Sequence, residues 1–430
     1  MIAVVAAFLI FLTLIAIGTP VFFGIFIGAG VGLYLVQGWS ALWSFFSLSL
    51  HTVIAQYTFA VIPMFILVGT LAESGGLGVR AYQSFHKLVG HVSGGLLIST
   101  TLAAAAFGAC SGSTVASAAL FSKIALPELR KYRYSESLSL GAIATAGSLA
   151  TLIPPSIMMV IFGILSNTSV GYLLIAGIVP GLLLTGLITV LIYVVAKMNP
   201  RMAPVRVEPV SVSERLMTLP RIWPLIAIFL IIIGSIWSGV VTASEAGALG
   251  VVVVLFWNFL IRVRVKSILG AFRDAAVTSC QIMILIVGGL MLSKVVAYSG
   301  LPADIINWIT VNSMPLTSVW ALTILMWLVL GMLIDSTSQL VLTVPFIFPV
   351  MTGLGADPLV IGIVAIVMIE VGVITPPVGF NCYVVSSIAG VDPAVAFKGI
   401  FPFFAVLLVV VVVLIAVPSL STWLPNLAFG

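Results

Sequence analysis

Charged residues are scarce in this sequence. Asp, Glu, Lys and Arg make up 7% of the 430 residues, whereas 62% of the residues are hydrophobic. Soluble domains are typically about a quarter charged, so this chain has too few charges to cover a water-facing surface of its size. The composition excludes a soluble enzyme or binding domain. It predicts an all-α polytopic membrane protein, because helices satisfy their own backbone groups in lipid.

Cysteine is also rare, and the net charge is only +5. The three cysteines lie in apolar stretches, which indicates buried side chains and neither a disulfide framework nor a metal cluster. The basic residues lie in short loops between apolar runs, which is typical of membrane topology and not of a nucleic-acid-binding protein. The first apolar run, 1–37, lacks a basic start and a clear cleavage site, so we expect membrane helix and not a signal peptide.

The groups that membrane enzymes need are missing as well. The three histidines (His51, His86 and His91) lie in or beside loops, out of reach of an intramembrane serine. An aspartyl membrane protease needs two intramembrane aspartates, and only Asp335 is well placed. The chain has no Walker A motif, so ATP hydrolysis is excluded as its energy source. These absences favour a transporter that is not an enzyme.

The apolar runs predict ten membrane crossings and two shorter hairpins. Each of the stretches 94–127 and 317–350 has two apolar arms of about 15 residues around a polar tip, and such an arm reaches ~22 Å, short of a ~30 Å hydrocarbon core. We therefore expect two re-entrant helical hairpins. The crossings are expected at about 2–17, 18–37, 52–75, 135–165, 172–197, 222–240, 244–261, 274–297, 359–387 and 400–424.

The basic residues predict an orientation for these crossings. If the crossings alternate, Lys and Arg gather in the loops of one side, and Lys294 alone lies inside a span. By the positive-inside rule that side is the cytoplasm of a bacterial inner-membrane protein. Hairpin 94–127 then enters from the cytoplasm and hairpin 317–350 from the periplasm, with both termini periplasmic. The cytoplasmic set is Arg80, Lys87, Lys123, Arg130, Lys131, Arg133, Lys197, Arg201, Arg206, Arg215, Arg221, Arg262, Arg264, Lys266, Arg273 and Lys398.

An internal repeat appears when the sequence is shifted by 222 residues. Pro127 then falls on Pro349, and Pro154-Pro155 falls on Pro376-Pro377. The halves are 1–197 and 222–430, joined by a cytoplasmic linker at 198–221. An odd number of crossings separates the halves, so we expect an inverted repeat with discontinuous helices, which is typical of secondary transporters.

The polar tip of the first hairpin is a candidate ion or substrate site. Ser111, Gly112, Ser113 and Thr114 combine flexible backbone with hydroxyl groups. Such hard oxygen ligands suit Na⁺ better than a soft metal. The alternative is close helix packing by small residues, which is common in membranes.

The tip of the second hairpin adds a carboxylate. Asp335 is followed by Ser336, Thr337 and Ser338. An acidic side chain is costly within a membrane and indicates a functional site, here with a cation as partner. The alternative is a buried ion pair between Asp335 and Lys294.

A Pro-Pro break follows each hairpin. Consecutive prolines remove backbone donors and leave carbonyl oxygens unpaired, so an unwound segment facing a tip would form a cage of oxygens. We expect one Na⁺ between the first tip and the break at Ala150–Pro154, with Ser111, Ser113 and Thr151 as ligands. A second is expected between the other tip and the break at Gly372–Pro376, with Asp335, Thr337 and Thr375 as ligands.

Substrate is expected between the two cages, where half-helix N-termini would favour a carboxylate. The alternative for each break is a structural hinge without a ligand. Glu370 lies deep in its span, where it either orients unwound backbone or neutralises a buried charge.

These motifs resemble the large membrane subunit of the tripartite ATP-independent periplasmic (TRAP) transporters. The resemblance covers essentially the whole chain and is most specific at two segments. The segments that carry it are Ile17–Val21, Pro63–Phe65, Glu73–Gly75, Ser111–Ser113, Ile153–Ser156, Gly331–Asp335 and Ile374–Gly379, of which the last two are the specific ones.

The resemblance implies Na⁺-driven uptake of an organic acid, typically a C4-dicarboxylate or a sialic acid. It implies an elevator mechanism, with a transport part mainly at 94–197 and 317–424 and a scaffold mainly at 1–75 and 222–273. It also implies two partners, a periplasmic substrate-binding protein and a small four-helix membrane subunit, here expected as a separate chain. A stand-alone Na⁺/carboxylate symporter of similar hairpin architecture and an ion channel remain alternatives.

Overall fold

Helices make up all the regular structure in the described part of the chain. The computed structural model describes residues 2–49, 51, 55–204 and 222–430, and no strand occurs within these ranges. This agrees with the predicted all-α class. The predicted linker at 198–221 lies largely outside the described residues, and so do its Arg206, Arg215 and Arg221.

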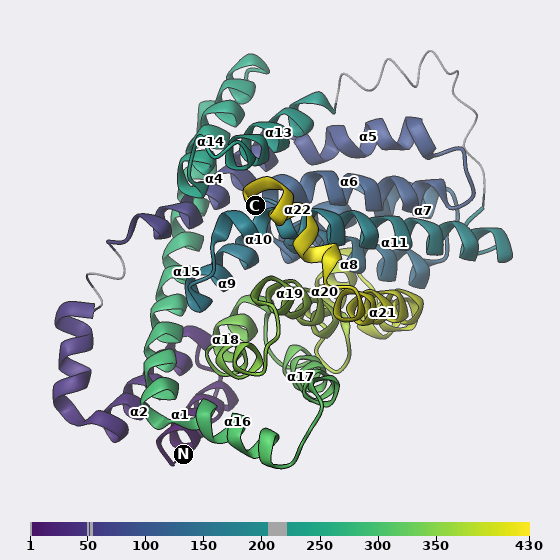
Figure 1. Cartoon of the computed structure of the whole chain (residues 1–430). Helices are drawn as coiled ribbons and strands as arrows, with labels where there is room; N and C mark the ends of the chain where they lie inside the picture. The colour runs from purple at the N-terminus through teal and green to yellow at the C-terminus, as the bar shows by residue number, and fades with distance from the viewer. Residues whose placement is uncertain (1, 50, 52–54, 205–221) are drawn as a thin grey trace.

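One group of helices is arranged around a long helix, α15 (Val265–Ser299). This helix packs against α1 (Ile2–Ala16), α2 (Val21–Ser44) and α4 (Val61–Ser74). In Figure 1, α15 runs along one side of the molecule, with α4 towards one end and α1 and α2 towards the other. We call these helices, with α13 (Trp223–Trp237) and α14 (Ala243–Leu260), the outer group. The predicted scaffold boundary at 273 falls inside α15.

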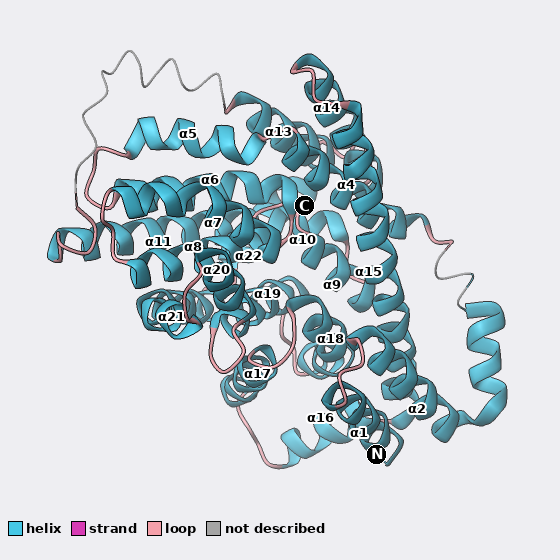
Figure 2. Cartoon of the chain, turned by 180° about the vertical axis from the view of Figure 1, so that it is seen from behind, coloured by secondary structure: helices cyan, strands magenta, loops and turns pink. Residues whose placement is uncertain are grey.

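The second group contains both predicted hairpins, and we call it the hairpin group. Each hairpin stretch is a helix–turn–helix, with turns at 112–113 and 332–335, and each is followed by a broken helix. Figure 1 and Figure 2 both show the first hairpin beside α8 and α11. The four helix pairs are α6 (Gly95–Ser111) with α7 (Thr114–Lys131), α8 (Glu136–Leu152) with α9 (Ile157–Ser166), α17 (Leu316–Gly331) with α18 (Ser336–Gly353), and α19 (Pro358–Ile374) with α20 (Phe380–Ala389).

The remaining helices complete the bundle. Helix α21 packs against α8 and α19, so it joins the two halves of the hairpin group, while α5 packs along α6. These elements are η1 (Phe45–Ser49), η2 (Tyr57–Ala60), α5 (Leu77–Val89), α10 (Val170–Ala176), α11 (Ile178–Met198), α16 (Leu301–Val311), α21 (Pro393–Ala416) and α22 (Ser419–Phe429).

The helix bounds recur along the chain with the offset seen in the sequence. Helices α7 and α18 begin 222 residues apart and have equal lengths, and α8 and α19 do the same. The two Pro-Pro bonds, Pro154-Pro155 and Pro376-Pro377, are both cis. Inversion of the two halves stays a prediction.

The lengths of the helices separate long spans from short ones. Within the described ranges, six helical segments are long and apolar enough to cross a membrane, and α8 with α9 passes the same test as a pair bent by 47°. Some predicted crossings are shorter, because α1 and α13 each have 15 residues and the crossing at 359–387 is broken into α19 and α20. The six segments are Val21–Ser47, Tyr57–Ser74, Val170–Met198, Ala243–Leu260, Val265–Ser299 and Pro393–Ala416.

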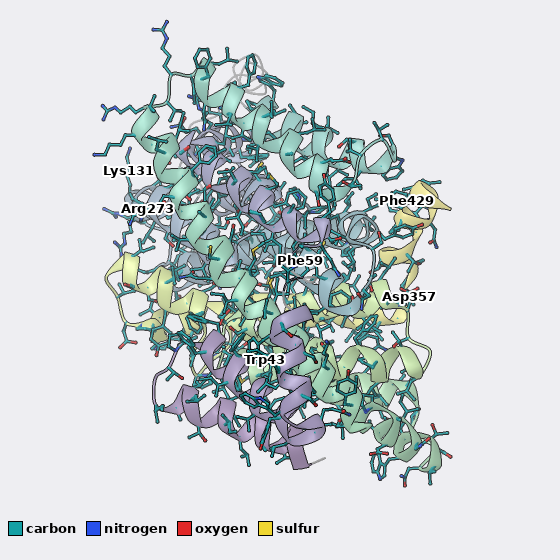
Figure 3. The ribbon with its side chains drawn as sticks, turned by 90° about the vertical axis from the view of Figure 1, so that its left-hand side faces the viewer. Trp43, Phe59, Lys131, Arg273, Asp357 and Phe429 are labelled. Carbon is teal, nitrogen blue, oxygen red and sulfur yellow. The ribbon has the colours of Figure 1, made fainter. Side chains whose placement is uncertain are left out.

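Residues from the two predicted sets of loops lie towards opposite ends of the molecule, and which end is cytoplasmic stays a prediction. Figure 3 shows Lys131 and Arg273, from the predicted cytoplasmic loops, together at one end. Asp357 and Phe429, which we expect on the periplasmic side, lie towards the opposite end in the same view.

Glycine lets α8 and α21 touch through their backbones. A Cβ added to Gly399 would lie 1.8 Å from the carbonyl oxygen of Ser137, and one added to Gly141 would lie 2.4 Å from the carbonyl oxygen of Gly399. Small residues at such contacts are a main source of packing energy between membrane helices, because lipid supplies no hydrophobic drive. The junction between α8 and α21 therefore depends on these glycines.

We expect Gly399→Ala to lower the thermal unfolding temperature of the purified chain. The added methyl group cannot be accommodated without moving α21, and overpacking of this kind typically costs about 1–3 kcal/mol. Gly234→Ala in α13 is the matched control, since the added Cβ meets no described atom within 4 Å. Equal unfolding temperatures for the two variants would contradict this packing.

Candidate functional site

Both hairpin turns open onto one cavity of about 440 Å³. The cavity lies between the hairpin group and the outer group, because α2 and α15 of the outer group supply part of its wall. The structure therefore brings together two segments that are more than 200 residues apart in the sequence. The lining residues are Val21, Phe22, Gly112, Ser113, Thr114, Val115, Thr151, Ile157, Met158, Thr278, Gln281, Ile282, Leu285, Asp335, Ser336, Thr337 and Ser338.

The first turn is built by a glycine and a capping serine. Gly112 ends α6 with a φ of +59°, a conformation that costs other residues more. Ser113 then caps α7 by accepting a hydrogen bond from the backbone N–H of Ala116 at 3.4 Å. The hydroxyl of Ser111 is buried and has no hydrogen-bond partner within the described ranges.

The first turn rests on the first Pro-Pro break. A Cβ on Gly108 would lie 2.6 Å from the Cα of Ala150, and one on Gly112 would lie 3.2 Å from the backbone nitrogen of Ile157. The structure thus places the first tip against the first break, as the sequence predicted.

The break itself satisfies part of its own backbone. Ser156 donates its hydroxyl proton to the carbonyl oxygen of Thr151 and accepts a hydrogen bond from the N–H of Met159 at 3.3 Å. Thr151 donates to the carbonyl oxygen of Ser148 at 2.8 Å. The oxygens of these hydroxyl groups keep lone pairs that can accept from a ligand or bind a cation.

Asp335 builds the second turn by capping α18. Its carboxylate accepts hydrogen bonds from the backbone N–H groups of Thr337 and Ser338, both at 3.1 Å. Among the described residues Asp335 forms no ion pair with Lys294, whose ammonium group lies 5.1 Å from the ring of Phe45. The carboxylate is therefore held at the cavity wall by the helix end and not by the lysine.

The second turn rests on the second break in the same way. A Cβ on Gly372 would lie 2.5 Å from the Cα of Gly331, so the two backbones touch. The backbone N–H of Val378 donates to the carbonyl oxygen of Met332 at 3.2 Å. The predicted pairing of each tip with the break of its own half is thus present in the structure.

Side chains also cross between the two halves at this point. Asn381 of α20 donates to the hydroxyl oxygen of Thr114 at 2.7 Å. The hydroxyl of Thr337 contacts the sulfur of Met158 at 3.8 Å. Each turn is therefore in contact with the broken helix of the other half as well as its own.

The predicted site residues divide into those on the wall and those behind it. The hydroxyl of Thr375 donates to the carbonyl oxygen of Val371, and Ala150 and Gly372 are helix contacts. Pro376 is exposed away from this cavity. On the wall are Gly112, Ser113, Thr114, Thr151, Asp335, Ser336, Thr337 and Ser338, whereas Ser111, Ala150, Pro154, Gly372, Thr375 and Pro376 do not line it.

Three helix N-termini meet at this cavity. The first residues of α7, α9 and α18 all line it. Helix N-termini carry unpaired N–H groups and a partial positive charge, so they bind anions. No Lys or Arg contributes to the described wall. The arrangement suits a carboxylate that is held by backbone and hydroxyl donors.

The oxygens around both turns fit Na⁺. The buried hydroxyl of Ser111 lacks a partner, and hydroxyl, carboxylate and backbone oxygens dominate both turns. Unwound backbone carbonyls and helix ends are the ligands by which transporters hold Na⁺. No cluster of three His, Cys, Asp or Glu occurs in the described part of the chain, so no site suits a transition metal there.

The sequence did not predict the cavity wall that comes from α2 and α15. Six of the described lining residues come from α2 and α15, and only two of these six are polar. The signal available was Gln281, a polar residue within an otherwise apolar span. The six residues are Val21, Phe22, Thr278, Gln281, Ile282 and Leu285.

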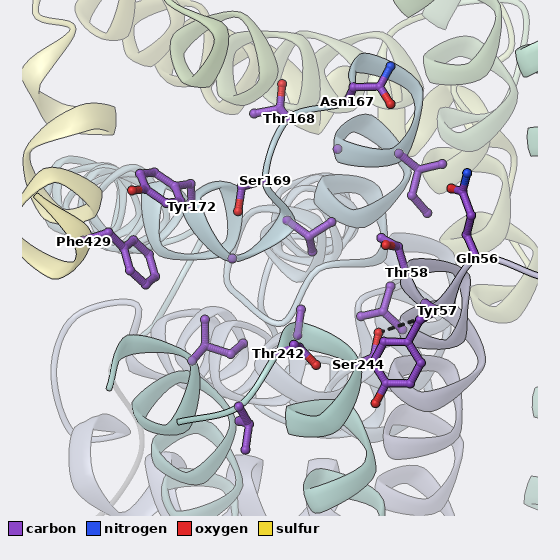
Figure 4. Close-up of a pocket in the computed structure, with 18 of the residues that line it drawn as sticks. Gln56, Tyr57, Thr58, Asn167, Thr168, Ser169, Tyr172, Thr242, Ser244 and Phe429 are labelled. Atoms are coloured by element: carbon purple, nitrogen blue, oxygen red, sulfur yellow. Dashed lines mark hydrogen bonds between the residues drawn. The ribbon is translucent and has the colours of Figure 1, made fainter. Parts of the chain in front are cut away.

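A second, more polar cavity of about 610 Å³ lies at the loops that we expect on the periplasmic side. Figure 4 shows Asn167, Thr168 and Ser169 on one side of it and Thr242 and Ser244 on the other. This cavity therefore lies between the loop before α10 and the loop before α14. Ser244 donates to the carbonyl oxygen of Tyr57 at 3.1 Å, which ties α14 to the segment before α4.

Most of this chain matches a known protein family. Residues 8–420 match the family described as "Tripartite ATP-independent periplasmic transporter, DctM component". This chain belongs to that TRAP transporter family. The resemblance found in the sequence is thereby confirmed.

Several TRAP relatives are similar over most of their length. The C4-dicarboxylate TRAP transporter large permease protein DctM of Pseudomonas aeruginosa is 33% identical, over 86% of this chain and 87% of that protein. The sialic acid permease protein SiaM of Vibrio cholerae is 30% identical, over 88% of both. The ectoine/5-hydroxyectoine permease protein UehC of Ruegeria pomeroyi is also 30% identical, over 98% of this chain and 99% of that protein. These relatives are transporter subunits by name.

A solved structure shares the fold. The YdaH transporter of Alcanivorax borkumensis has a TM-score of 0.66 to this TRAP subunit, with 90% of each chain covered and 15% identity. At this identity the likeness shows the fold alone.

The cavity wall predicts a pattern of chemical labelling. In a Cys280→Ser background, we expect Gln281→Cys to react quickly with a charged methanethiosulfonate, because Gln281 is exposed and lines the cavity. Ser386→Cys is the matched control, since Ser386 has an exposure of 0%. Mass spectrometry of the native protein measures both rates, and equal rates would contradict an open cavity at this place.

Proposed function

We propose that this TRAP subunit carries out Na⁺-coupled uptake of an organic acid across the bacterial inner membrane. The observation that supports it most is the single cavity at which both hairpin turns and three helix N-termini meet. The substrate class is a carboxylate, as in the C4-dicarboxylate and sialic acid systems for which relatives are named. The carboxylate takes its hydrogen bonds from the starts of α7, α9 and α18.

Two Na⁺ ions neutralise the site in this proposal. One lies between the first turn and the first break, with Ser111, Ser113 and Thr151 as ligands. The other lies between the second turn and the second break, with Asp335 and Thr337 on the turn. Ions held there compensate the negative charge of Asp335 and of the substrate, and this makes binding of substrate and ion mutually favourable.

The transport step is proposed to be an elevator movement of the hairpin group against the outer group. Each turn is in backbone contact with the break of its own half, so turn and break move together as a unit. The cavity wall combines this unit with α2 and α15 of the outer group, so a sliding movement between the groups exposes the cavity to the other side.

The two partners of the proposed system are a small four-helix membrane subunit and a periplasmic binding protein. The family's own name describes tripartite, periplasmic systems. The binding protein delivers substrate to the face that carries the polar cavity near Thr242 and Asn167.

We expect uptake only when an inward Na⁺ gradient is applied. Proteoliposomes that hold the chain, its small subunit and its binding protein are loaded with K⁺ salt and diluted into Na⁺ medium with a radiolabelled C4-dicarboxylate or sialic acid. Dilution into K⁺ medium is the control. Equal uptake in both media would contradict coupling to Na⁺. Uptake without the binding protein would favour a stand-alone symporter.

We expect Asp335→Ala and Ser113→Ala to raise the Na⁺ concentration for half-maximal uptake. Removing a ligand from a charged site costs roughly 1.5–3 kcal/mol, which corresponds to about tenfold or more in apparent affinity. Glu245→Gln, in the periplasmic capping box of α14 and away from the cavity, is the control. Unchanged Na⁺ titrations in both site variants would argue against the placement of the ions.

A further inference from the structure

Glu370 is a buried carboxylate that belongs to neither hairpin turn and to neither Pro-Pro break. It lies on α19 with an exposure of 2%, and it does not line the cavity. One of its oxygens accepts a hydrogen bond from Ser336 at 3.1 Å. Its Oε2 has no hydrogen-bond partner, and no ion pair within the described ranges involves Glu370.

Buried hydroxyl groups of other elements surround this carboxylate. The hydroxyl of Ser148 on α8 lies near Glu370 and has no other hydrogen-bond partner in the described part of the chain. The hydroxyl groups of Thr114 and Thr151 lie near the same carboxylate. The cluster therefore draws oxygens from the first turn, from α8 and α19, and from the second turn through Ser336.

Asn381 extends the cluster through Thr114. Its amide nitrogen is fully used, because it donates to Thr114 at 2.7 Å and to the carbonyl oxygen of Ala144 at 3.2 Å. This orientation leaves its buried Oδ1 as an acceptor without a donor. Thr114 thus connects Asn381 to the oxygens around Glu370, at the junction of the two halves.

The oxygens of this cluster suit a cation. A buried carboxylate without a compensating charge is strongly disfavoured, and an acidic group within a membrane indicates a function and a partner. Hydroxyl, amide and carboxylate oxygens are hard ligands, and no His or Cys accompanies them among the contacts described. The ligand class that fits is a small, dehydrated alkali cation.

We propose that Glu370, Ser148 and Asn381 form a third Na⁺ site, between the two halves and directly behind the cavity wall. The site rests on the Na⁺ coupling proposed above and goes beyond it by adding an ion shared by both halves. Thr114, Thr151 and Ser336 each face the cavity and also lie near Glu370. An ion here fixes both turns relative to each other and so shapes the substrate cavity without touching the substrate.

Glu370→Gln tests the site because it removes the charge and keeps the shape. The purified full-length chain is titrated with NaCl against choline chloride at constant ionic strength, and its thermal unfolding temperature is followed. Radioactive Na⁺ bound per chain is counted in parallel. We expect the half-saturating Na⁺ concentration to rise about tenfold or more, and the number of bound ions to fall by one. Glu73→Gln, at the end of α4, is the matched control and should behave as wild type.

Two further variants keep the test decisive if Glu370→Gln does not fold. Ser148→Ala and Glu370→Asp should both shift the Na⁺ titration in the same direction, by less than the loss of the charge. If wild type responds to Na⁺ and the variants keep its titration and ion count, the site is overturned and Glu370 is a neutral carboxylic acid. If wild type itself shows neither Na⁺ stabilisation nor Na⁺-driven uptake, the proposed function fails first.

Discussion

Broken backbone inside a membrane has to be sheltered by protein, and this constraint organises the whole chain. Four irregular segments interrupt the helices of the hairpin group, at 112–113, 153–156, 332–335 and 375–379. The structure places each turn against the break of its own half, where polar groups are paired locally. The hydroxyl of Ser156 donates a hydrogen bond to the carbonyl oxygen of Thr151, and the carboxylate of Asp335 accepts hydrogen bonds from the N–H groups at the start of α18.

The sequence predicted these four segments because they contrast with what surrounds them. Gly-Ser-Thr runs and Pro-Pro pairs stand out in a chain that is otherwise apolar, and the offset of 222 residues relates one pair to the other. The prolines themselves were a less direct guide. Pro154 and Pro376 interrupt the helices, but the neighbouring hydroxyl groups and helix starts form the wall.

The contribution of α2 and α15 could not be read from the sequence. Their lining residues are mostly ordinary apolar side chains, such as Val21 and Leu285, and nothing in their spacing distinguishes a cavity wall from a helix contact. The contacts between halves were hidden for a related reason. Asn381 and Thr114 are 267 residues apart, and only the packing of α20 against α7 brings them together.

The mixed origin of the cavity wall has a consequence for how such proteins diversify. The turns and breaks carry the groups that pair the irregular backbone, so substitutions there endanger folding. Residues such as Phe22 and Gln281 lie on helices away from the turns and breaks, and they pair no irregular backbone. Substitutions in α2 and α15 can therefore change the shape of the cavity without changing the turns and breaks. Relatives named for C4-dicarboxylate, sialic acid and ectoine could then share one fold and differ in the residues of α2 and α15 that line the cavity.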